Sequence, residues 1–146
     1  KRWKMSNLKI FVLAGFQNTG KTTILNRLIR DLRDSGFKKI SGVVRELHEK
    51  CDDKDGYAFL ENGKEKIYIA TAGDMLWQVR DNIAEAKKNG ATKLVISCHV
   101  TTKDSQQEII IHDSEATIIY KPKYPKKEDS ESVFDLYVDR LKSYLL

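Results

Sequence analysis

The stretch GFQNTGKT, residues 15–22, limits the possible folds of this chain more than any other segment. An almost uninterrupted apolar run, residues 8–14, precedes it, as expected for a buried parallel strand. Apolar residues then recur at helical spacing as far as Leu32, and Ser35 with Gly36 predicts the end of that helix. The sequence therefore predicts a strand, a glycine-rich turn and a helix in immediate succession.

This succession predicts a loop that binds phosphate. Gly15 and Gly20 give the backbone the freedom to curl, so that successive N–H groups point inward at an anion. The helix that starts near Lys21 adds the positive end of its dipole to the same place. We expect Lys21 to reach the β and γ phosphates, the hydroxyl of Thr22 to coordinate Mg²⁺, and Thr23 to lie beside them.

The segment formed by residues 8–36 resembles the Walker A unit of the P-loop nucleoside triphosphatases and kinases, which carry G-x₄-G-K-[ST] between a strand and a helix. The resemblance implies a three-layer α/β fold and, as ligands, Mg²⁺ and a nucleoside triphosphate. It also implies phosphoryl transfer to water or to a small acceptor.

The remaining sequence continues to alternate strands and helices. Strands are predicted at residues 38–44, 92–100 and 117–121, and residues 57–70 read as a β-hairpin around Asn62 and Gly63. A mostly parallel sheet with one hairpin follows, in an α/β fold. With 146 residues, of which 40% are apolar, we expect one domain.

Two helices are predicted between these strands and one after them. The first begins near Met75 and ends at Asn89-Gly90. Residues 101–116 are ambiguous, because Ser105 and Glu108 could form a capping box while the isoleucines that follow would suit a strand; we favour a short helix. The apolar face of the last helix is predicted to comprise Val133, Leu136, Tyr137, Leu141 and Tyr144.

A second acid is expected to hold Mg²⁺ opposite the phosphates. The strand at residues 92–100 has Ser97, Cys98 and His99 where such an acid would be expected, which leaves Asp74 as the candidate catalytic and metal-binding carboxylate. The alternative for Asp74 is the N-cap of the helix that begins at Met75.

The sequence Thr71-Ala72-Gly73 in front of Asp74 resembles the Ras-like small GTPases. That resemblance implies that the amide of Gly73 senses the γ phosphate, although Ala70 stands where those proteins have an aspartate. The residues predicted to contact the nucleotide are Gly15, Asn18, Thr19, Gly20, Lys21, Thr22, Thr23 and Gly73.

The guanine-recognition sequence Asn/Thr-Lys-x-Asp is missing. Lys121 has no aspartate after it, and the sequence TTKDS at residues 101–105 is one residue too short. We therefore expect ATP rather than GTP, with Lys121 or Tyr124 as candidates beside the base.

Two kinds of function remain open. The first is an ATPase or a small kinase, with Lys21 and Asp74 as catalytic residues; candidate acceptor-binding residues are Arg45, Glu46 and Arg80. The second is a GTPase-like module that binds a partner protein through residues 46–56 when its nucleotide changes. A weak nucleotide binder that acts as a basic scaffold would be a third case.

The net charge of +5 favours anionic partners, but acidic residues follow the basic stretch at residues 121–127, so nucleic acid is not a favoured partner. Zinc is disfavoured, because Cys98 and His99 are adjacent and would have to join His48 and Cys51 on one ion. No apolar run approaches the roughly 20 residues of a membrane span, and the two cysteines show no disulfide framework, so we expect a cytoplasmic protein.

Overall fold

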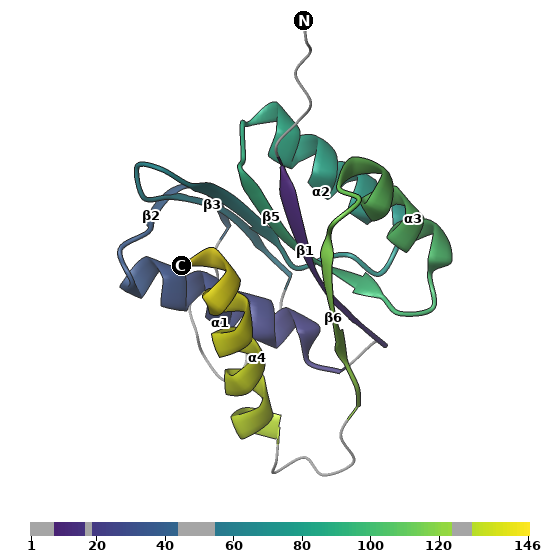
Figure 1. The fold of residues 1–146 in the computed structure, drawn as a ribbon. Helices are drawn as coiled ribbons and strands as arrows, with labels where there is room; N and C mark the ends of the chain where they lie inside the picture. Colours follow the sequence, from purple (N-terminus) through teal and green to yellow (C-terminus); the bar gives the residue numbers. More distant parts are fainter. Residues whose placement is uncertain (1–7, 17–18, 44–54, 124–129) are drawn as a thin grey trace, which may run out of the picture.

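The computed structural model describes residues 8–16, 19–43, 55–123 and 130–146. Figure 1 shows the described strands and helices along the chain. They are β1 (Lys9–Gly15), α1 (Lys21–Asp34), β2 (Lys38–Val43), β3 (Tyr57–Glu61), β4 (Lys66–Ala70), α2 (Leu76–Lys88), β5 (Lys93–His99), α3 (Lys103–His112), β6 (Thr117–Lys121) and α4 (Ser130–Leu145). Several residues singled out by the sequence lie outside the described residues: Asn18, Arg45, Glu46, His48, Cys51 and Tyr124.

The strands form one 6-stranded sheet in the order β2-β3-β4-β5-β1-β6. The four strands from β4 to β6 run parallel, and β2 and β3 run antiparallel to their neighbours. The predicted α/β fold with a mostly parallel sheet and one hairpin is confirmed. Because β1 lies between β5 and β6, the phosphate loop that follows it emerges from the interior of the sheet.

The helices cover both faces of the sheet, α1 and α4 on one and α2 and α3 on the other (Figure 1). Strand β1 is buried on both faces, since its side chains alternate between the two cores. Leu13 belongs to the same core as Leu28 of α1, and Val12 belongs to the same core as Ile83 of α2. This double burial explains why the first strand reads as a continuous apolar run.

The parallel strands end at one edge of the sheet. Gly15 at the end of β1 is in register with His99 of β5 and with Lys121 of β6. The antiparallel pairing of Tyr57 with Ala70 brings the start of β3 to the same edge as the end of β4. Loops from distant parts of the sequence therefore meet beside the phosphate loop.

The short helix favoured within residues 101–116 is confirmed as α3, Lys103–His112, but its predicted capping box is wrong. Thr102 occupies the N-cap position, and its carbonyl accepts the amide of Gln106 at 3.3 Å. Ser105 therefore lies within the first turn of α3, where its buried hydroxyl has no hydrogen-bond partner among the described residues.

The last helix faces the core with a side that agrees with the predicted one only in part, at Leu141 and at Tyr137, which packs against the core. Val138, Leu141 and Leu145 are buried, whereas Leu136 is 67% exposed. The buried positions are three and four residues apart and face α1, which turns Leu136 towards solvent. None of the described helices has the length and apolar character that crossing a membrane requires.

Candidate functional site

A pocket of about 440 Å³ opens at the carboxyl edge of the sheet. The start of α1, the turn after β4 and the start of α2 form its walls. The lining residues are Gly20, Lys21, Thr22, Thr23, Asp55, Thr71, Ala72, Gly73, Asp74, Met75, Gln78 and Ser97. Most of the predicted site residues are therefore brought together around one cavity.

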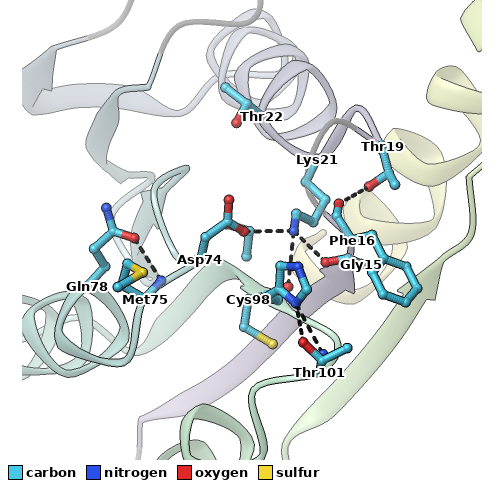
Figure 2. Close-up of polar contacts among 12 residues, drawn as sticks. Gly15, Phe16, Thr19, Lys21, Thr22, Asp74, Met75, Gln78, Cys98 and Thr101 are labelled. Atoms are coloured by element: carbon cyan, nitrogen blue, oxygen red, sulfur yellow. Dashed lines mark hydrogen bonds and ion pairs between the residues drawn. The ribbon is translucent and has the colours of Figure 1, made fainter.

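Lys21 holds its ammonium group at the base of this pocket and is only 6% exposed. Its Nζ donates to the carbonyl of Gly15 at 2.6 Å, to Oδ1 of Asp74 at 3.0 Å and to the carbonyl of Cys98 at 3.3 Å (Figure 2). A buried charge is tolerated only when it is paired and hydrogen-bonded, and the three oxygens meet that need. The ammonium therefore has a fixed position without any ligand.

The two glycines of the motif are needed for different reasons. Gly20 has φ 95°, which is the left-handed region that the sequence argument requires. Gly15 is not among the described glycines with positive φ, so the freedom predicted for it is not used. Instead, a Cβ on Gly15 would lie 2.8 Å from the carbonyl oxygen of Lys121, so close packing against β6 requires the glycine.

The turn after β4 is held by hydrogen bonds to the neighbouring strand and to α2. The hydroxyl of Ser97 donates to the carbonyl of Thr71 at 2.7 Å, and Asn82 donates to the carbonyl of Ala72 at 2.9 Å. A Cβ on Gly73 would lie 1.8 Å from the carbonyl oxygen of Ser97, which no side chain could tolerate. The serine that stands in place of the expected acid thus fixes the turn that carries Gly73.

Asp74 pairs with Lys21, and the helix-cap interpretation of this residue is wrong. Met75 is the N-cap residue of α2, and its amide donates to the side chain of Gln78 at 3.0 Å. The attraction of the ammonium group, 3.0 Å from the carboxylate, accounts for this orientation. Asp74 thus lines the pocket, two residues before the first residue of α2.

Asp55 is a pocket residue that the sequence analysis missed. Its Oδ1 accepts from the hydroxyl of Thr71 at 3.0 Å and from the hydroxyl of Thr22 at 3.3 Å. The sequence analysis included Asp55 only in the segment 46–56, as part of a surface that would bind a partner protein. The usable signal was the predicted hairpin, because its pairing places the residues before β3 next to those that follow β4.

Residues 10–97 match the family model of the molybdopterin guanine dinucleotide synthesis protein B. The chain belongs to this family. It is a P-loop domain of the nucleotide-binding class, as the glycine loop predicts. No curated protein and no solved structure matches the chain. The family match includes the whole pocket and ends before α3, β6 and α4.

Outside the family match, Lys121 lies on the other side of the phosphate loop from the pocket. It is 3% exposed, and its Nζ donates to the carbonyl of Pro122 at 2.8 Å. The same nitrogen lies 5.6 Å from the ring centre of Phe134 and 5.8 Å from that of Tyr137. Burial lowers the pKa of Lys121.

Thr19 and Thr23, both predicted contacts, occupy different places in the loop. Thr23 lines the pocket. Thr19 is buried, and its hydroxyl donates to the carbonyl of Phe16 at 2.9 Å, which stabilises the curl of the loop (Figure 2).

Two weaker candidates of the sequence analysis have structural partners. Arg80 forms an ion pair with Glu108 of α3 at 3.1 Å and does not line the pocket. Cys98 is buried in the core, which raises its pKa to about 11, while the ring of His99 contacts the hydroxyl of Thr101 at 2.8 Å. The described residues include no group of three or more histidine, cysteine or acidic residues that could hold a metal.

Proposed function

We propose that this chain binds a guanine nucleotide together with Mg²⁺, with the phosphates in the pocket beside Lys21. The observation that carries the proposal is the buried ammonium of Lys21, which three oxygens hold at the base of a cavity next to the start of α1. Arriving phosphate oxygens can replace Asp74 as its partner, while the carbonyls of Gly15 and Cys98 keep the ammonium in place.

The residues of the pocket suit the phosphates and the metal. The amides at the start of α1 and the dipole of that helix favour an anion at Gly20, Lys21 and Thr22. Mg²⁺ prefers oxygen ligands, and the pocket offers the hydroxyl of Thr22 and two carboxylates. We assign phosphate contacts also to Gly15, Asn18, Thr19, Thr23 and Gly73. The metal role predicted for Asp74 remains a proposal.

The choice of guanine rests on the family description, which names a guanine dinucleotide. The expectation of ATP rests on a missing recognition sequence in the region of β6, which lies outside the family match. ATP therefore stays the competing ligand, and a direct comparison of nucleotides decides between the two.

For the chemistry, we propose phosphoryl transfer to water or to a small acceptor. Lys21 and the loop amides would stabilise the charge on the transferred group, and Asp74 would be the nearest acid.

A slow nucleotide-dependent switch is the second candidate. It is favoured by the contacts of Asp55, which joins the end of the segment 46–56 to Thr22 and Thr71. We propose one domain for the chain, because both cores share a single sheet.

The test is a thermal-shift and calorimetric comparison of GDP, GTP, ADP and ATP with and without Mg²⁺, followed by phosphate release. We expect the guanine nucleotides with Mg²⁺ to give the largest shift. Lys21→Ala should weaken binding about 100-fold, because charged hydrogen bonds to phosphate contribute roughly 3 kcal/mol together. Lys64→Ala, an exposed lysine of the hairpin turn, is the matched control and should bind as the wild type does.

The outcomes separate the candidates. A larger thermal shift with ATP than with GTP would show that the chain prefers an adenine nucleotide over a guanine nucleotide. Nucleotide binding without measurable phosphate release would favour the switch. If neither GTP nor ATP bound, or if Lys21→Ala bound as tightly as the wild type, the proposed function would be wrong.

A further inference from the structure

Among the described residues that line the pocket, acidic side chains outnumber basic ones, although the pocket is expected to receive an anion. The charged ones in that described part of the lining are Lys21, Asp55 and Asp74. Phosphate oxygens brought into this cavity meet two carboxylates as well as one ammonium, and like charges at short distance repel. A cation that lies between the carboxylates and the phosphates would remove this conflict.

The two carboxylates have different partners. Asp74 accepts from the ammonium of Lys21 at 3.0 Å. Asp55 accepts from the hydroxyl groups of Thr22 at 3.3 Å and of Thr71 at 3.0 Å. Only Asp55 therefore contacts the threonine whose hydroxyl is the proposed metal ligand.

The contact with Asp55 also prepares the hydroxyl of Thr22 for a cation. A threonine hydroxyl has one proton to donate and two lone pairs to offer. When the proton is donated to Asp55, the lone pairs of Thr22 are directed elsewhere and remain available to a metal ion. Thr71, which is 2% exposed, donates to the same carboxylate oxygen at 3.0 Å and helps to hold it in place.

We propose that Asp55, rather than Asp74, is the carboxylate that anchors Mg²⁺ at the hydroxyl of Thr22. The inference rests on the proposed nucleotide binding at this pocket and adds the identity of the metal-anchoring acid. The usual acid at the end of β5 is replaced by Ser97, so the negative charge comes instead from the residue that precedes β3. The cation thereby joins the segment before β3 to the start of α1.

The experiment measures the dissociation constant of GDP and GTP in excess Mg²⁺ and in excess EDTA, for the wild type, Asp55→Asn, Asp74→Asn and Asp81→Asn. Asp81 is an exposed acid of α2 outside the pocket, which makes it the matched control. The affinity of each nucleotide complex for Mn²⁺, measured by electron paramagnetic resonance, reports the metal directly. Thermal melting without ligand confirms that each variant is folded.

Mg²⁺ should raise the nucleotide affinity of the wild type, and in Asp55→Asn we expect this increase to be smaller by about tenfold or more. The nucleotide complex of the variant should also bind Mn²⁺ less tightly, by a similar factor. In EDTA the same variant should bind GDP more tightly than the wild type, because one repelling charge is gone. Asp74→Asn should lose less of the Mg²⁺ effect, and Asp81→Asn none. The substitution Asp55→Asn should thus weaken nucleotide binding in Mg²⁺ and strengthen GDP binding in EDTA. A residue with a purely structural role would not change affinity in opposite directions under the two conditions.

Two results would overturn this proposal without affecting the proposed function. The first is an unchanged Mg²⁺ effect in Asp55→Asn; if its affinity fell equally in Mg²⁺ and in EDTA, Asp55 would only shape the pocket. The second is a larger loss of the Mg²⁺ effect in Asp74→Asn than in Asp55→Asn. If the wild type bound neither nucleotide under either condition, the proposed function and this inference would both be wrong.

Discussion

The two sides of the phosphate loop hold a buried lysine in different ways. On the pocket side, Lys21 is surrounded by oxygens: two carbonyl groups and the carboxylate of Asp74. On the α4 side, defined by Lys121, Phe134 and Tyr137, the ammonium of Lys121 contacts the carbonyl of Pro122 and lies near the rings of Phe134 and Tyr137. Oxygen partners can be exchanged for phosphate oxygens, whereas rings packed against a loop cannot.

This difference separates the tasks of neighbouring residues in the motif. Lys21 has its partners on the pocket side, while a Cβ on Gly20 would lie 2.4 Å from the ring of Phe134 on the α4 side. The family match includes Lys21 and Asp74 on the pocket side and ends at residue 97, before the residues that define the α4 side. We infer that one side provides ligand chemistry and the other fixes the shape of the loop.

The largest expected effect tests the packing on the α4 side. Gly20→Ala should lower the free energy of unfolding by about 3 kcal/mol, because it combines a left-handed φ with a clash against Phe134. Chemical denaturation followed by circular dichroism measures the change.

A double-mutant cycle separates the two causes. In a Phe134→Ala background the clash disappears and the backbone strain remains, so the cost of Gly20→Ala should fall to about 1–2 kcal/mol. Equal costs in both backgrounds would show that the ring does not restrict the loop.

A smaller effect is expected on the free energy of unfolding in alkaline solution, where the two sides of the loop should behave differently. Burial raises the pKa of Cys98, on the pocket side, from 9.0 to about 11. The folded state therefore holds this proton more tightly than the unfolded state, and stability should fall by about 2 kcal/mol as the pH rises from 9 to 11. Cys98→Ala should remove that fall, as measured by denaturation across this pH range.

Lys121, on the α4 side, should show the opposite slope. Burial lowers its pKa below the ordinary value of 10.5, so the unfolded state binds the proton more tightly and stability should rise as the pH approaches that value. Lys121→Met should remove this rise. For each lysine or cysteine variant, the free energy of unfolding of the variant is subtracted from that of the wild type and followed against pH. If this difference changed in the same direction for Cys98→Ala and for Lys121→Met, the comparison would be contradicted.

The smallest effect is expected at Arg80, which belongs to neither side. Its ion pair with Glu108 is exposed, and Arg80→Ala should change the free energy of unfolding by about 0.5 kcal/mol or less. Nucleotide affinity should stay unchanged in calorimetry. A clear loss of nucleotide affinity would restore Arg80 as a candidate site residue.

Local spacing predicted the part of the site that lies within one segment. The strand, the turn and the helix around Lys21 and Thr22 depend on neighbouring residues, so the motif alone determines them. The sequence also placed Gly73 and Asp74 in the right turn, but it left the role of Asp74 open. Asp55 was missed because its contacts with Thr22 and Thr71 join residues that are 33 and 16 positions apart.

By itself, the sequence determined the α/β alternation, the hairpin and the phosphate loop, since hydrophobic period and turn chemistry act over short distances. Only the tertiary structure decided why Gly15 must lack a side chain, which acid contacts Thr22 and which face of α4 is buried. The physical reason is the same for all three. Each depends on a close approach between segments whose distance along the chain carries no information about their distance in space.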